Sequence, residues 1–181
     1  MTTPRLTVTL NALALYAVAL LLVAAFGLQV VLRELPCPLC LLQRVAFAAL
    51  AVGPVLNLRF GPRPSHYAVS LLAAVLGAVF AMRQVLLHIA PGDPGYGSAI
   101  LGYHYYTWAL VCFAAAIVLI ALVLLFDRQF EGAGSPPPLT LFEKAAVWLV
   151  IGITAANAVA VFVECGPSVC PDDPVTYWMF S

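Results

Sequence analysis

Charged residues are scarce in this sequence: only 9% of its 181 residues are charged, and eight acidic residues balance eight basic ones. Without a net basic charge, the chain has no electrostatic reason to bind nucleic acid. Apolar residues take the place of charged ones, at 64% of the chain and a mean hydropathy of +1.02. Because a water-soluble domain cannot bury that much apolar surface, we expect lipid to surround most of the chain.

The sequence also lacks internal repeats and long polar linkers, so we expect one transmembrane domain over residues 1–181. The first apolar run, from Leu6 to Leu32, exceeds the roughly 7–15 apolar residues of a signal peptide and has no small-x-small cleavage site followed by a soluble domain. We therefore interpret it as a membrane helix.

Five stretches reach the roughly 20 mostly apolar residues that cross a membrane. They are Val8–Val31, Leu41–Leu58, Tyr67–Leu87, Thr107–Phe126 and Phe142–Val163. The predicted fold class is all-α: a polytopic membrane helix bundle with short loops. Gly53-Pro54 is expected to kink the second helix, which a buried helix tolerates.

Basic residues predict the orientation, because they favour the cytoplasmic side. With five spans, one side carries Arg5, Arg59, Arg63, Arg128 and Lys144, and the other carries Arg33, Arg44 and Arg83. The N-terminus should therefore be cytoplasmic and the C-terminus outside. Both close cysteine pairs then lie on the outer, oxidising face, where disulfides persist.

The segment between the third and fourth helices is turn-rich from Pro91 to Gly97 and then apolar and aromatic up to Tyr106. Such aromatics are typical of a membrane interface. We expect a short interfacial helix around residues 98–106, which either covers a site between helices or only anchors the chain. His88 and His104 are possible hydrogen-bond donors to a ligand there.

Cys37 and Cys40 form a Cys-x-x-Cys pair, a thiol–disulfide or metal motif. Pro36 and Pro38 disfavour helix before the second cysteine, so the second helix should begin near residues 38–40. The helix N-terminus favours a thiolate there, and Arg44 shares a helix face with Cys40. The alternative is an unreactive pair or a simple staple.

Arg44 and Arg83 are costly at membrane depth, and such charges usually mark a functional site. The alternative is that each side chain extends to the lipid surface. Gln84, beside Arg83, offers neutral hydrogen bonds.

Cys165 and Cys170 follow the last helix, and the Gly-Pro between them suits a local disulfide. That disulfide is either a staple or exchangeable with an outside partner. The four outer cysteines have the ligand count of a zinc site, but Pro38, Arg44 and the membrane edge argue against it, so no metal is expected. Cys112, alone in an apolar run, should be a small buried residue.

The motif Cys37-Pro38-Leu39-Cys40, followed by Gln43-Arg44 at the start of a membrane helix, resembles the DsbB family of disulfide-bond formation proteins. The likeness covers the first three helices, including Arg83-Gln84 and the apolar turn that ends at Pro91, and is looser beyond.

The resemblance implies an enzyme, a quinone-dependent protein-disulfide oxidoreductase of the bacterial inner membrane. Such proteins oxidise a periplasmic thioredoxin-like partner (DsbA-like) and pass electrons to a quinone, either ubiquinone or menaquinone. Cys40 matches the cysteine beside the quinone, Cys37 the one that exchanges with the second pair, and Arg44 the arginine near the quinone ring. The further candidates for cofactor binding are Arg83, Gln84 (a histidine in other members) and His88.

The chain departs from the family pattern in one respect. Family members usually have four spans and carry the second cysteine pair after the third, whereas here Cys165 and Cys170 follow a fifth. We expect a four-helix DsbB-like core plus one helix, with Cys165 and Cys170 as catalytic shuttle cysteines. Two alternatives stay open: an epoxide-reductase-like quinone reductase, and a non-catalytic membrane protein with structural disulfides.

Overall fold

The computed structural model describes residues 4–126, 129–130 and 136–180. It is a helical bundle, as predicted, with five segments long and apolar enough to cross a membrane. The helices are α1 (Pro4–Leu32), α2 (Pro38–Leu50), α3 (Val52–Phe60), α4 (Pro64–Leu87), α5 (Tyr105–Leu124) and α6 (Leu141–Cys165), with α2 and α3 forming one span. A 3-10 turn, η2 (Trp178–Phe180), follows α6. Arg128, one of the basic residues used to predict the orientation, lies outside the described residues.

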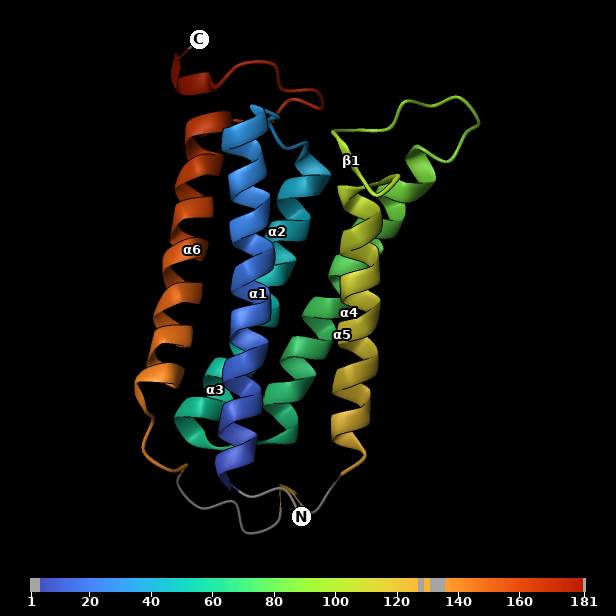
Figure 1. The fold of residues 1–181 in the computed structure, drawn as a ribbon. Helices are drawn as coiled ribbons and strands as arrows, with labels where there is room; N and C mark the ends of the chain where they lie inside the picture. Colours follow the sequence, from blue (N-terminus) through green and yellow to red (C-terminus); the bar gives the residue numbers. More distant parts are fainter. Residues whose placement is uncertain (1–3, 127–128, 131–135, 181) are drawn as a thin grey trace.

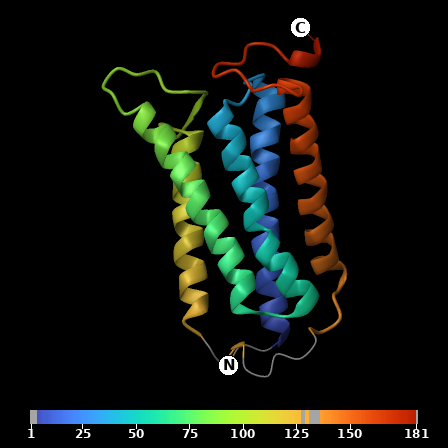
Figure 2. The ribbon, with the colours of Figure 1, turned by 180° about the vertical axis from the view of Figure 1, so that it is seen from behind.

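Helix α1 lies between α6 on one side and α4 and α5 on the other, with α2 and α3 behind it (Figures 1 and 2). Its inward stripe repeats at helical spacing and is almost fully buried, at Val8, Ala12, Leu15, Ala19 and Leu22. The bundle's outer surface is apolar: Leu72, Leu119 and Trp148 are each more than 60% exposed. Side chains of this kind are stable in lipid, so the exposure pattern agrees with a membrane location.

The kink expected at Gly53-Pro54 is observed as the break between α2 and α3. Pro54 has no N–H, so the Leu50 carbonyl loses its helical donor. Ser70 of α4 replaces that donor, with its Oγ 2.8 Å from the Leu50 oxygen. Gly53 permits this approach, because a Cβ there would lie 2.2 Å from Ser70 Oγ.

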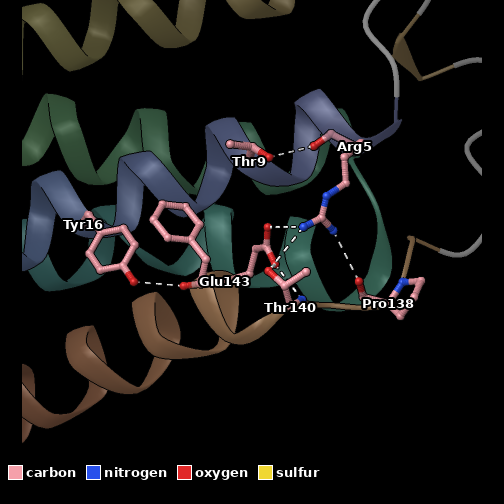
Figure 3. A network of polar contacts seen from close by, with 7 residues as sticks. Arg5, Thr9, Tyr16, Pro138, Thr140 and Glu143 are labelled. Atoms are coloured by element: carbon pink, nitrogen blue, oxygen red, sulfur yellow. Dashed lines mark hydrogen bonds and ion pairs between the residues drawn. The ribbon is translucent and has the colours of Figure 1, made fainter.

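A polar network fastens α6 to α1 at the end of the bundle that carries the N-terminus (Figure 3). Thr140 and Glu143 form a capping box at the start of α6, and the buried Glu143 carboxylate pairs with Arg5 at 2.8 Å. Farther along α1, Tyr16 donates to the Phe142 carbonyl at 3.0 Å. The Glu143 carboxylate therefore caps the first amides of α6 and also forms an ion pair with Arg5, so its buried charge is compensated.

The connections place both close cysteine pairs at one end of the bundle. The α1–α2 connection, the α4–α5 segment and the C-terminal tail all lie opposite the N-terminus (Figure 1). Cys37 and Cys40 are in the first of these connections or just after it, and Cys165 and Cys170 are at the start of the tail. This arrangement is the one that five spans predict and four would not.

The prediction of an interfacial helix around residues 98–106 is wrong. Residues 99–104 form a two-stranded antiparallel hairpin, β1 (Ala99–Ile100) and β2 (Tyr103–His104), and Tyr105 already begins α5. Leu101 and Gly102 both have positive φ, of 52° and 82°. Two consecutive positive φ values are what a two-residue hairpin turn requires and a right-handed helix excludes.

Helix α4 packs against α5 at Gly77, and a substitution at this position tests the packing. A Cβ at Gly77 would lie 2.3 Å from the Phe113 ring, which is fully buried and stacks on Phe47 at 4.0 Å. We expect Gly77→Ala to lower the free energy of unfolding in detergent by about 1–3 kcal/mol through overpacking.

The matched control is Gly152→Ala, because a Cβ there meets no atom within 4 Å. That variant should gain up to about 1 kcal/mol from helix propensity. Equal effects of the two substitutions on thermal unfolding would contradict this account of the α4–α5 contact.

Candidate functional site

The Cys-x-x-Cys pair forms the N-terminus of α2, where the sequence predicted it. Cys37 is the N-cap residue, and its Sγ accepts from the backbone N–H of Cys40 at 3.3 Å. Pro38 occupies the first helical position, where its missing N–H costs nothing. Both thiols are free; Cys37 is 6% exposed and Cys40 is half-buried. The helix N-terminus therefore directs one of its amides at the Cys37 sulfur, and both sulfurs lie at the positive end of the α2 dipole.

Gln84 of α4 contacts both sulfurs. Its Nε2 donates to Cys37 Sγ at 3.2 Å and to Cys40 Sγ at 3.3 Å, and its Oε1 accepts from Gln43 at 2.7 Å. The Gln84 side chain is 1% exposed, so these bonds form away from bulk water. A carboxamide N–H directed at sulfur stabilises the thiolate form.

The environment of Cys37 keeps that thiol protonated. Its hydrogen bond with Cys40 is the main cause, and burial adds to it; together they raise the pKa of Cys37 well above the usual thiol range. Two adjacent sulfurs cannot both carry charge cheaply, so the pair favours one thiolate at most.

Arg44 lies one turn into α2 and is held by three neutral acceptors. Its guanidinium donates to Gln29 Oε1 at 2.6 Å and to the Ala25 carbonyl at 3.0 Å, both from α1, and to Asn157 Oδ1 of α6 at 3.3 Å. Among the described residues, no carboxylate pairs directly with Arg44. The positive charge is thus held in place by hydrogen bonds and stays available to an anion.

A cavity of about 410 Å³ opens beside Cys40 and Arg44, between α1, α2, α5 and the hairpin. Its walls are mostly apolar and aromatic. The lining includes the aromatic residues Phe47, Tyr96, Tyr105, Tyr106 and Trp108 and the polar residues Gln29, Gln43 and Arg44. Cys112, expected to be buried, instead is half-exposed and lines this cavity.

The segment before the hairpin covers the cavity and the α1–α2 connection. Tyr96 donates to the Leu35 carbonyl at 2.6 Å, and Ser98 binds the Glu34 carboxylate through its backbone N–H and its hydroxyl. Burial raises the pKa of Tyr96, so its hydroxyl stays a donor. Of the two roles considered for this region, the structure shows the covering one, performed by a loop and hairpin.

Three of the four predicted cofactor-binding residues do not line the cavity, and one of these, Gln84, contacts the two sulfurs instead. Arg83 is exposed in a separate, outward-facing groove between α4 and α5. His88 ends α4, where its Nδ1 lies 3.0 Å from Asp93 Oδ1 and its ring stacks on Tyr106. The Gly95 amide and His88 lower the pKa of Asp93, so His88 has an anionic partner outside the cavity.

The tail cysteines form the local disulfide that their spacing suggested, with a Cα–Cα distance of 4.8 Å. Cys165 ends α6 and is 3% exposed, whereas Cys170 is half-exposed and follows Val169, which is 94% exposed. Gly166 makes the turn with a φ of 62° and packs on the Trp178 ring. The two sulfurs of this disulfide therefore differ in access from outside.

The sequence interpretation missed Gln29, Asn157 and Glu164. Each is a buried polar residue in an otherwise apolar helix, Gln29 in α1 and the other two in α6. Intramembrane polar residues are a signal of function, and this signal was present in the sequence. What the sequence did not contain was the helix packing that brings all three to Arg44.

These features define a class: a multi-pass helical membrane protein with a Cys-x-x-Cys pair at a helix N-terminus, next to a buried arginine and an apolar cavity. The family model described as "Disulfide bond formation protein DsbB" matches residues 7–98, slightly more than half of the chain. The chain belongs to the DsbB family.

Curated relatives carry the same family name. The proteins named "Disulfide bond formation protein B" from Xanthomonas axonopodis pv. citri and Xanthomonas euvesicatoria pv. vesicatoria are 42% and 41% identical over 86 residues. Those residues are 45% of this chain and 50% of each relative, so the chain spans about half the length of the curated relatives it matches. No solved structure matches it significantly. The family match thus ends before α5, α6 and the tail.

The contacts of Gln84 yield a prediction about thiol reactivity. Gln84→Ala removes the N–H donors to both sulfurs and should slow alkylation of Cys40 by iodoacetamide at neutral pH about tenfold, which corresponds to one donor to a charged group. Gln84→Glu, which brings a second anion, should slow it further.

The control is Gln129→Ala, the same residue type at the other end of the bundle, where the Gln129 side chain donates to the Val123 carbonyl. That variant should alkylate at the wild-type rate. If Gln84→Ala also did, the amide would have no electrostatic role at the sulfurs.

Proposed function

We propose that this chain is a membrane thiol:quinone oxidoreductase that supports disulfide-bond formation. The observation that carries the proposal is the cavity wall: Cys40 and Arg44 line the same apolar, aromatic cavity, within a chain of the DsbB family. A free thiol beside a mostly apolar cavity suits an electron acceptor that is itself apolar. The N-terminus would then be cytoplasmic, in a bacterial inner membrane, with residues 1–181 as one domain.

The residues present fit a quinone. A volume of about 410 Å³ is within the range of small-molecule sites, and aromatic walls suit a flat ring. The positive charge of Arg44 has only neutral partners, so it can stabilise negative charge on an oxygen of the ligand. A bound quinone, ubiquinone or menaquinone, would supply an acceptor for two electrons and two protons.

Cys40 is the residue we assign to the acceptor side. It lines the cavity, whereas Cys37 does not and stays a thiol because its pKa is raised. Cys37 is therefore assigned to exchange with the second cysteine pair, which leaves Cys40 as the departing thiolate. Gln84 donates to that sulfur, and the positive N-terminal end of α2 favours a thiolate there, so Cys40 is a good leaving group.

The tail disulfide is proposed as the shuttle to a protein partner. Cys170 is the accessible sulfur, so a partner thiolate attacks it and Cys165 leaves as the thiolate. Exchange between the tail and the buried Cys37 then requires the covering segment at Tyr96–Ser98 to move. The partner's dithiol becomes a disulfide, and its two electrons pass through Cys165/Cys170 and Cys37/Cys40. The partner we propose is a periplasmic thioredoxin-like dithiol oxidase.

The first test separates the two cysteine pairs. Purified protein, a soluble quinone and a reduced thioredoxin-like protein should consume quinone, and Cys40→Ser should abolish turnover because no thiolate remains at the cavity. Full turnover by Cys40→Ser would refute the scheme. The double variant Cys165→Ser/Cys170→Ser should lose oxidation of the protein partner and keep oxidation of a small dithiol. If oxidation of the protein partner were unchanged, the tail disulfide would have only a structural role.

A second test reads ligand binding without turnover. In a variant with Cys37 and Cys40 both changed to serine, Cys112 is the free thiol of the cavity wall. A quinone analogue should slow alkylation of Cys112 by an apolar maleimide at least fivefold, roughly the effect of occupancy at four times Kd. No protection at saturating analogue would place the quinone outside this cavity.

A further inference from the structure

Helix α6 carries two almost fully buried glutamates, one near each end. Glu143 is 1% exposed and has a complete set of partners in Arg5 and Thr140. Glu164 is 2% exposed; its Oε2 accepts only from Gln29 at 3.3 Å, and its Oε1 has no hydrogen-bond partner among the described residues. A buried, half-satisfied carboxyl group is destabilising, so packing and stability do not account for Glu164.

Glu164 is linked to Arg44 through a single amide. Gln29 donates from Nε2 to Glu164 and accepts at Oε1 from Arg44, at 3.3 Å and 2.6 Å. The carboxyl group is thus one side chain removed from the cation. Asn157, two turns earlier on α6, accepts from Arg44 directly. Helix α6 lies outside the part of the chain that matches the family, so this acid is a feature of this chain's additional helix.

The groups around Glu164 contain one cation and several acids. Helix α2 contributes Arg44 and Cys40, the covering segment contributes Tyr96, and the tail contributes Tyr177 near Arg44; α1 contributes only the neutral Gln29. The tyrosines are neutral at physiological pH. Two acids, Cys40 and Glu164, therefore compete for the field of Arg44, and in a site of low dielectric both cannot be ionised at small cost.

We propose that Glu164 and Cys40 share one proton, so that Glu164 is the proton-holding group of the thiol site. This inference rests on the proposed function. In the reduced site Cys40 is a thiolate and Glu164 is protonated. In the oxidised site, where Cys37 and Cys40 form a disulfide, Glu164 is ionised.

The step balances. Oxidation of the pair forms the Cys37–Cys40 S–S bond and releases two electrons, one proton from the Cys37 thiol and one proton from the Glu164 carboxyl group. Two electrons and two protons are what a quinone takes up on full reduction. The net charge of the site is the same before and after, with one anion beside Arg44 in each state, so the reaction avoids creating or removing a buried charge.

The test uses infrared difference spectroscopy on the full chain in detergent, with the Cys37–Cys40 disulfide reduced electrochemically and no quinone or partner present. Reduction should produce a protonated-carboxyl C=O band that is absent from Glu164→Gln and shifted in Glu164→Asp. A Cys165→Ser/Cys170→Ser background confines the redox change to the first pair. If the wild-type band is missing, or survives in Glu164→Gln, the proposal is wrong.

The pH dependence of the reduction potential, measured near neutral pH in the same background, provides the second readout. In the wild type, reduction of the Cys37–Cys40 disulfide takes up two electrons and two protons, one at Cys37 and one at Glu164. Glu164→Gln cannot take up the second proton, so the slope of the potential against pH should fall to half. Glu143→Gln is the matched control, an equally buried glutamate of the same helix, and should leave the slope unchanged. A slope in folded Glu164→Gln equal to that of the wild type would also overturn the proposal.

Both readouts are independent of quinone and partner. Failure of quinone reduction with an intact carboxyl band would refute the proposed function alone. Normal turnover with no band would refute only the role of Glu164.

Discussion

The structure of the site depends on one constraint: Arg44 is a cation placed inside the span of an apolar bundle. A charge there must find partners within the protein. Arg44 lies on α2, and its hydrogen-bond acceptors lie on α1 and α6. The three helices are therefore held at fixed positions around the guanidinium. Because the partners are neutral, the charge is positioned without being cancelled, and the neighbouring cavity acquires a fixed positive wall.

The two sulfurs next to this charge are made unequal by their surroundings. Cys37 caps the helix, is buried and has a raised pKa, whereas Cys40 lies one turn closer to Arg44 and borders the cavity. Gln84 contacts both. The tail disulfide has the same asymmetry, with one buried and one accessible sulfur. The relay proposed above needs one entry sulfur and one leaving sulfur in each pair, and in both pairs the two cysteines differ in burial.

Helix α6 joins two parts of the molecule that the chain separates. Its start is fixed to α1 by Arg5 and Glu143, and its last turns carry Asn157 and Glu164 to Arg44 before ending at Cys165. The helix that carries the tail disulfide therefore also completes the environment of the arginine. Loss of α6 would remove acceptors from the buried cation in addition to removing the second cysteine pair.

The sequence by itself determined the five spans, the start of the second helix, the common face of both cysteine pairs and the placement of Arg44 one turn after Cys40 on one helix. Those features follow from hydropathy, proline and residue spacing, which are local properties of the chain. The tertiary structure alone decided that Gln84 contacts the sulfurs, that Arg83 and His88 lie outside the cavity, and that residues 99–104 form a hairpin. Which polar side chains meet depends on helix rotation and on two positive φ values, and neither is encoded in a hydropathy pattern.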